Sequence, residues 1–421
     1  MELLNGRWSR VDIDIRRGAR GYFHSSRRCV CRALASAGWV LLVVGVAHAA
    51  DQGAEPDPLV LGAFTEFTHD NNLYRVPDNG EALGTTLPAG AQRDDNIFRV
   101  GVDLKAHGEY GRQALSLTGN VFDQRYSDND YLNNVSGKGE LGWDWQTALN
   151  FSGTLRASYR RWLNGFANTR SYSQDLISRT GYEGTLRRDV GARWTVVAGA
   201  GYSDSTHSAV ESSGDDQRAT KASAGIEYQT SLGNMVGWDY RYGHGRYDNA
   251  QNDYHDNTAR VRGILLLSHM WTFSGSVGVQ HRDYPNATDR NFSGGVWNAD
   301  LNWQPRERSS VVLSGWRELR AWQDAESNHY VSDGVRLVPT WDSGLHWRVS
   351  LEGSWERDEY LGSSGATSRD DTLKTVTGTV NYTFLKRLQL TLNARSAHRD
   401  SSDPAYDYDD QVVSAGLAAT W

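Results

Sequence analysis

The sequence predicts an all-β fold: a transmembrane, antiparallel, up-and-down β-barrel of about 18 strands, with 16 as the alternative count. Three observations predict it. Apolar and polar residues alternate with a period of two along most of the chain, whereas helical periodicity is nearly absent. Short and long connections alternate between these segments. The chain is also rich in aromatic residues, with 16 Trp and 20 Tyr, although only 38% of its residues are hydrophobic.

Alternation is clearest in five segments, which place apolar or small residues at every second position and polar residues between them: 151–160, 345–356, 376–384, 388–395 and 413–421. In the second of these, Leu345, Trp347 and Leu351 share one face, whereas Arg348 and Glu352 lie on the other. Side chains alternate between the two faces of a strand, so each segment has one apolar and one wet side. Segments of this kind recur from Pro58 to Trp421.

The connections fall into two groups. Short ones at 231–234, 306–310, 342–344 and 385–387 alternate with longer polar ones at 69–95, 205–217, 362–371 and 400–407. Short turns at one end and long loops at the other are typical of bacterial outer-membrane barrels, whose even strand number places both termini in the periplasm. Only Pro339 falls inside a predicted strand. Because proline has no N–H, we expect it near the periplasmic rim or at a bulge.

The N-terminal segment has the features of an export signal. Basic residues at Arg27, Arg28 and Arg32 precede an apolar run of 14 residues, 33–46, and small residues follow at Ala47 and Ala49. We therefore predict a signal peptide with an N-terminal extension at 1–49, a short periplasmic segment at 50–57 and the barrel at 58–421. A buried helix of a soluble domain is the alternative. The length of the extension favours a start codon downstream of Met1.

Removal of this segment would change the net charge from −7 to −12, because it holds eight arginines and three acidic residues. Cys29 and Cys31 would leave with it, which excludes disulfides, thiolate metal sites and cysteine nucleophiles from the exported chain. The acidic balance argues against nucleic acid as a partner.

Neither an enzyme nor a cofactor is predicted. A histidine stands beside a serine at His207 and Ser208, but adjacent side chains of a polar loop diverge and do not form a catalytic pair. Carboxylates cluster at 127–134 and 406–410, where they could bind Ca²⁺. Solvated surface loops explain both clusters more simply, so no metal site is predicted.

The apolar face is expected to contact the lipid of the outer membrane, because a closed barrel pairs all its backbone polar groups. Six tryptophans lie near predicted short turns, as an aromatic girdle at the periplasmic interface would: Trp143, Trp194, Trp271, Trp303, Trp347 and Trp421. The alternative interpretation is that these tryptophans fill the core of a β-sandwich. We expect the last strand to close the barrel against the first. With Val413, Leu417 and Trp421 it resembles the signal read by the barrel-assembly machinery, although that signal usually ends in Phe.

The wet face is predicted to line a water channel, because about 18 strands leave a lumen too wide for side chains to fill. The candidate lumen-lining residues are Arg99, Lys105, Lys138, Arg156, Arg160, Arg241, Arg262, Asp300, Arg348, Glu352, Glu356 and Arg395. These charges either pair with one another and stiffen a wet lumen, or form a path for a hydrophilic solute. A saccharide is a plausible solute, because sugar rings pack on aromatic faces and three tryptophans lie on the same face or at the loop end: Trp162, Trp316 and Trp322.

A motif follows the first predicted strand: Asp70, Asn71, Asn72, Leu73, Tyr74 and Arg75, with Pro77 after it. It resembles the start of the EpsL-type barrels of exopolysaccharide biosynthesis loci, a branch of the putative β-barrel porin class. An additional Asn and a Tyr in place of Phe are departures. The similarity in size and strand spacing extends over 58–421. The resemblance implies an outer-membrane component of polysaccharide export in a Gram-negative bacterium, with periplasmic export components as partners and no catalytic residues.

Two other functions stay open from the sequence: a general or sugar-specific uptake porin, and a non-conducting barrel that holds polysaccharide on its outer loops. For the motif itself, we expect Leu73 and Tyr74 to fold the loop back into the barrel mouth. Arg75 would then pair with an acidic residue of the inner wall. The alternative is a simple loop start whose apolar residues anchor the first strand.

Overall fold

The computed structural model describes residues 58–78, 87–169, 171–321, 329–361, 369–385 and 387–421. The predicted signal peptide, the segment 50–57 and Trp322 lie outside these ranges. None of the helices in the described residues is long and apolar enough to cross a bilayer.

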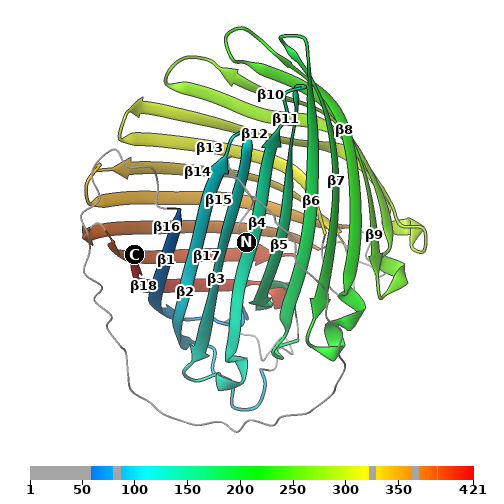
Figure 1. Cartoon of the computed structure of the whole chain (residues 1–421). Coiled ribbons are helices and arrows are strands. Elements are labelled where there is room, and N and C mark those ends of the chain that lie inside the picture. Colours follow the sequence, from blue (N-terminus) through cyan, green and yellow to red (C-terminus); the bar gives the residue numbers. More distant parts are fainter. Residues whose placement is uncertain (1–57, 79–86, 170, 322–328, 362–368, 386) are drawn as a thin grey trace, which may run out of the picture.

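The architecture is one sheet of 18 strands. The strands are β1 (Leu59–Asp70), β2 (Asp95–Tyr110), β3 (Gln113–Tyr126), β4 (Asn134–Gln146), β5 (Phe151–Leu163), β6 (Leu176–Val190), β7 (Trp194–His207), β8 (Gln217–Gln229), β9 (Met235–Tyr247), β10 (Tyr254–Leu266), β11 (Trp271–Asp283), β12 (Phe292–Arg306), β13 (Ser309–Ala321), β14 (His329–Asp342), β15 (Trp347–Leu361), β16 (Asp370–Leu385), β17 (Leu388–Ser401) and β18 (Tyr408–Thr420). Each strand pairs antiparallel with its neighbour in the chain, and β1 pairs with β18. In Figure 1 the strands of the near wall and those of the far wall cross steeply, as tilted strands of a barrel do. The prediction of an 18-stranded antiparallel barrel is confirmed.

The first and last strands close the sheet, as predicted. They lie side by side in Figure 1, and their register pairs Gly62 with Thr420. Leu61 and Trp421 exchange both backbone hydrogen bonds, with N–O distances of 3.1 and 2.9 Å. Val413, Leu417 and Trp421 are all exposed on the outer face. Closure pairs the edge of β1 with that of β18, so neither of these edges is left open to lipid.

The outer face carries exposed apolar residues at alternate positions of nearly every strand, which explains how a chain with few hydrophobic residues forms a lipid-facing surface. All six predicted girdle tryptophans lie at the short-turn ends of their strands. Trp271 stacks on Trp303 with ring centroids 5.2 Å apart, and Trp347 contacts Tyr382 at 4.4 Å. Pro339 lies three residues before the end of β14, opposite Val311, so it is near the rim, as predicted.

Four of the longer loops are each closed by the same type of hydrogen bond. Each holds a single 3-10 turn: η2 (Asp130–Leu132), η5 (Ala250–Asn252), η6 (Thr288–Arg290) or η7 (Pro404–Tyr406). In each, an Asn or Asp at the end of the loop accepts a hydrogen bond from a backbone N–H at the end of the preceding strand. The donor and acceptor pairs are Tyr126 with Asn133, Tyr247 with Asp253, Tyr284 with Asn291, and Ser401 with Asp407. These side chains replace ladder bonds that end with the strand, which keeps the loops compact.

Candidate functional site at the barrel mouth

The register places all twelve predicted lumen residues on the face opposite the exposed apolar side chains. Five of them are in ion pairs: Arg99 with Glu66, Arg156 with Glu140, Arg262 with Asp239, Glu356 with Arg320, and Arg395 with Asp410. The other seven form no ion pair within the described ranges. They are Lys105, Lys138, Arg160, Arg241, Asp300, Arg348 and Glu352. The wall therefore combines self-paired charges with charges left for water or solute.

The paired charges extend into one network across β6, β8, β9 and β10. Glu227 on β8 accepts hydrogen bonds from Arg187 on β6 and Arg262 on β10. Asp239 on β9 accepts from Arg260 at 2.9 Å and lies 3.5 Å from Arg262. Because its charges largely compensate one another, this network stiffens the wall without offering a strong site for an ion.

The loop between β1 and β2, which we call the first loop, is described at residues 71–78 and 87–94, and the motif that follows β1 holds its start. Asn72 is fully buried, and its Nδ2 donates to the carbonyl oxygens of Val76 and Asp409, both at 2.8 Å. Its own N–H donates to Asp70 Oδ1 at 3.0 Å. Asn71 accepts a hydrogen bond from the N–H of Gln411 on β18 at 2.7 Å. The two asparagines therefore fix the start of this loop to the last strand of the barrel.

Arg75 joins the loop to the inner wall. Its guanidinium donates to Asp70 at 2.8 Å and lies 3.0 Å from Asp410, a fully buried carboxylate on β18. Burial acts to lower the pKa of Arg75, but the hydrogen bond to Asp70 and the charge of Asp410 outweigh it, so the pKa is raised. The residue has a positive φ of 54°, which L-amino acids rarely adopt. The predicted pairing of Arg75 with an acidic wall residue is confirmed.

The two apolar residues of the motif anchor a hydrophobic cluster, which we call the mouth cluster. Tyr74 is fully buried, and its ring lies 4.9 Å from that of Phe166 and 5.5 Å from that of Tyr172. Its hydroxyl donates to Asn129 Oδ1 at 2.7 Å, and burial raises the pKa of this hydroxyl well above its ordinary value. The members of the mouth cluster are Leu73, Tyr74, Val76, Ile97, Tyr126, Leu132, Phe166 and Tyr172. The first loop thus folds inward, as predicted, instead of only anchoring the first strand.

Three loops meet in the mouth cluster: the first loop, the loop 127–133 and the loop 164–175. The carboxylate of Asp95, which is fully buried, organises the second of these by accepting hydrogen bonds from the N–H groups of Ser127, Asp128 and Asn129. Among the described residues, no group of three or more His, Cys, Asp or Glu side chains is placed to hold a metal ion.

The loop 164–175 connects β5 to β6 but also contacts β17 and the residue that precedes β16, on another part of the wall. It contains η3 (Phe166–Asn168), and Asn168 Oδ1 accepts hydrogen bonds from Arg399 on β17 and from Arg369, which precedes β16. Arg399 also donates to the carbonyl of Ala167. This loop therefore crosses the inside of the mouth and narrows the lumen.

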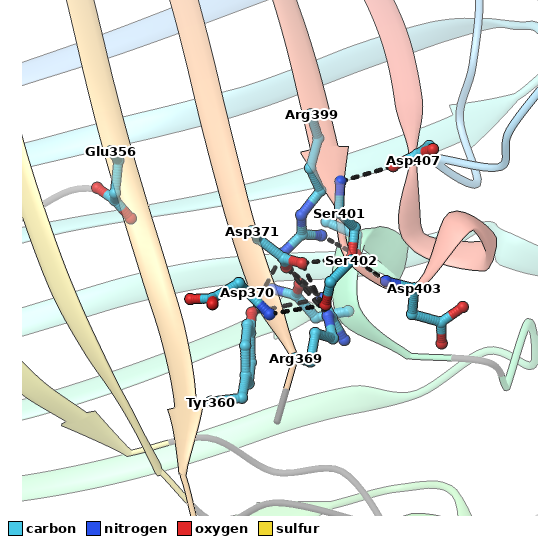
Figure 2. A network of polar contacts seen from close by, with 12 residues as sticks. Glu356, Tyr360, Arg369, Asp370, Asp371, Arg399, Ser401, Ser402, Asp403 and Asp407 are labelled. Carbon is cyan, nitrogen blue, oxygen red and sulfur yellow. Dashed lines mark hydrogen bonds and ion pairs between the residues drawn. The ribbon is translucent and has the colours of Figure 1, made fainter. Parts of the chain in front are cut away.

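We call Asn168, Tyr360, Arg369, Asp371 and Arg399 the latch. Figure 2 shows Asp371 between the two guanidinium groups, 2.6 Å from Arg369 and 2.7 Å from Arg399. Both arginines lie close to the Tyr360 hydroxyl, and the Arg369 guanidinium is over the Tyr360 ring at 4.3 Å. Burial acts to lower the pKa of Arg369, but Asp371 outweighs it, so the pKa is raised. The latch is a buried and charged contact, which is costly to disrupt.

A cavity of about 530 Å³ lies beside these loops, against the inner face of β2 to β5. Lys138, Arg160 and Trp162 line it together with Phe122 and residues of the loop 164–175. Trp316, by contrast, is buried, and its indole N–H donates to Ser332 at 3.3 Å. Its expected availability as a sugar-stacking surface is therefore wrong, because its ring is enclosed by the wall.

The loop histidine has a structural role. His207 contacts Asp216 at 3.1 Å, and Ser208 Oγ accepts a hydrogen bond from the N–H of Leu176. Both side chains connect neighbouring loop ends. The sequence analysis did not identify Asn168, Asp371, Arg399 or Arg179 as site residues. The alternation of apolar and polar residues does place Arg399 and Arg179 on the wet face of their strands.

A closed barrel with a lipid-facing exterior, a charged wet interior and an inward-folded loop defines the class of outer-membrane β-barrel porins. The family described as Putative beta-barrel porin 2 matches residues 81–420, and the chain belongs to this family. No curated protein sequence matches.

Solved porin structures are similar at low sequence identity. OccK9 (OpdG) of Pseudomonas aeruginosa is 13% identical, with 86% of this chain and 98% of that chain covered and a TM-score of 0.48. OccK2 (OpdF) of the same organism, in complex with glucuronate, is 13% identical, with 86% of this chain and 98% of that chain covered and a TM-score of 0.47. A BenF-like porin from Pseudomonas fluorescens Pf-5 is 12% identical, with 87% of this chain and 99% of that chain covered and a TM-score of 0.48.

Proposed function

We propose that this protein is a passive channel for hydrophilic, saccharide-like solutes in the outer membrane of a Gram-negative bacterium. The observation that carries the proposal is the wet inner face, where seven of twelve charged positions lack an ion pair within the described residues. An 18-stranded barrel leaves an aqueous interior that such charges line. The loop 164–175, held by the latch, narrows this path at the mouth and favours short solutes over long ones.

Export of an exopolysaccharide is the second candidate. It is favoured by the motif from Asp70 to Arg75, in which every residue has a defined role in folding the first loop inward. The resemblance to barrels of exopolysaccharide loci rests on the same residues. An extended polymer would need the latch to open, because Asn168 is bound to Arg399 on another part of the wall.

Single-channel conductance of the refolded protein in a planar bilayer tests the channel. We expect a stable open current that neutral and uronic-acid oligosaccharides reduce in a length-dependent manner. A barrel that is folded, as judged by heat-modifiable migration on a gel, but carries no current would contradict the proposal. Such a result would favour the non-conducting attachment barrel.

Deletion of the gene in its own host distinguishes the direction of transport. Loss of secreted polysaccharide with normal growth on oligosaccharides would support export. Slow growth on low concentrations of an oligosaccharide, with normal secretion, would support uptake. The matched control keeps the folded barrel but blocks its pore, for example with a cysteine that is placed in the lumen and then labelled. It separates the loss of transport from the loss of the whole protein.

A further inference from the structure

Three cationic side chains lie beside one another on adjacent strands of the inner wall. Lys138 on β4 is directly opposite Arg160 on β5, which in turn is directly opposite Arg179 on β6. We call these residues the cation row. Like charges in directly opposite cross-strand positions repel each other and destabilise a sheet. Their arrangement therefore has an energetic cost that a bound anion would offset.

No acidic side chain compensates the cation row within the described part of the chain. Arg179 donates to Ser205 Oγ at 3.4 Å, and the Arg160 guanidinium lies over the Trp162 ring at 4.6 Å from its centroid. Glu140, two residues from Lys138 on β4, is bound to Arg156 at 2.8 Å. The row thus differs from the rest of the wall, where most arginines contact a carboxylate.

The cation row borders a space of suitable size. Lys138 and Arg160 line the cavity of about 530 Å³ together with Trp162 and Phe122. Small-molecule sites have volumes of about 300–1,000 Å³. A guanidinium presents a planar pair of donors that matches the two oxygens of a carboxylate. The aromatic side chains offer apolar surface to the C–H groups of a sugar ring.

We propose that the cation row and this cavity bind a saccharide that carries a carboxylate, a uronate, within the lumen. The carboxylate lies between Lys138 and Arg160, with Arg179 adding charge, and the ring packs against the aromatic side chains. The proposal rests on the proposed channel function and adds to it the charge class of the solute. A neutral sugar lacks the group that the row holds.

Ligand-observed NMR with the folded barrel in detergent at 150 mM salt tests the site, because it detects weak binding and needs no conduction. Glucuronate is titrated alongside glucose and acetate. We expect glucuronate to bind more tightly than either, and R160Q to weaken it by about tenfold or more, since hydrogen bonds between charged groups contribute most to such binding. R241Q is the matched control: it removes a lumen arginine of β9 that also lacks an ion pair in the described residues, and should change the affinity less than about twofold.

Three results would overturn the site. Glucuronate binding no tighter than glucose would remove the role of the carboxylate, and acetate binding as tightly as glucuronate would remove the role of the sugar. Equal losses in R160Q and R241Q would mean that the general charge of the lumen, and not the row, attracts the anion. A barrel that binds glucuronate but carries no current contradicts the channel and leaves the site intact, whereas a conducting barrel that fails to bind contradicts the site alone.

Discussion

Arg399 on β17 donates a hydrogen bond to the side chain of Asn168, which precedes it by 231 positions in the chain. No other part of the loop 164–175 contacts β17 through a described hydrogen bond, apart from the carbonyl of Ala167. Ala167 and Asn168 thus connect two parts of the wall across the inside of the mouth, and Asn168 does so through its side chain. Because the same guanidinium also holds Asp371, the position of the loop depends on the latch as a whole.

Replacement of Asn168 should open the mouth. In N168A the loop loses the acceptor shared by Arg399 and Arg369, so we expect a larger single-channel current and more frequent current fluctuations than in the wild type. N164A is the control, because Asn164 lies on the same loop but its side chain donates only to Asp175 within the loop. Equal currents in N168A, N164A and the wild type would show that the latch does not limit the path.

Loss of the carboxylate of the latch should destabilise the barrel. D371N leaves Arg369 and Arg399 buried without a counter-ion, which costs about 3–5 kcal/mol. D370N is the control: Asp370 is its neighbour in sequence but faces outward, where its ion pair with Arg357 at 3.3 Å is exposed and contributes less than about 1 kcal/mol. Urea-dependent unfolding in detergent, followed by tryptophan fluorescence, measures both. A D371N barrel as stable as D370N would contradict the assignment of a strong buried pair.

Removal of the first-loop motif should unblock the lumen. Deletion of residues 71–75 eliminates the contacts of Tyr74 with Phe166 and Tyr172 and that of Arg75 with Asp410. We expect a higher conductance, because the loops of the mouth cluster then lose their common anchor. The milder Y74F removes only the hydrogen bonds of the hydroxyl to Asn129 and Tyr131 and should leave conductance near that of the wild type. Unchanged conductance after the deletion would show that the first loop does not obstruct the path.

The fold could be predicted from the sequence because its signal is local. A two-residue period, a turn and an aromatic residue at a strand end are each visible in a dozen residues, and closure of β1 on β18 requires only an even number of such units. The inward folding of the first loop was also accessible. Leu73 and Tyr74 are apolar residues in a polar segment, and a buried cation beside them, Arg75, needs an acidic partner.

The identity of charge partners was not accessible. The strand phase places Arg187 and Glu227 on the wet face, but their pairing depends on the tilt and register of strands 40 positions apart. The latch depends on a loop that contacts a wall segment more than 200 positions away, and Asn168 stands in a stretch that resembles any polar loop. The cation row shows an intermediate case. The faces of Lys138 and Arg160 could be predicted, whereas their direct opposition required the register.

The contact between the loops 164–175 and 208–216 should depend on pH through Glu211. Its carboxylate accepts hydrogen bonds from the hydroxyls of Ser171 and Ser173, and these hydrogen bonds lower the pKa of Glu211. A lowered pKa in the folded protein means that the contact is stabilising above the ordinary pKa and is lost as the pH falls through the folded value. E211A removes the contact at every pH. We therefore expect current fluctuations to differ between the wild type and E211A at pH 7 and to converge when the pH is lowered below the folded pKa of Glu211. A difference that persists unchanged at low pH would contradict this role of Glu211, because the two proteins differ only in this side chain.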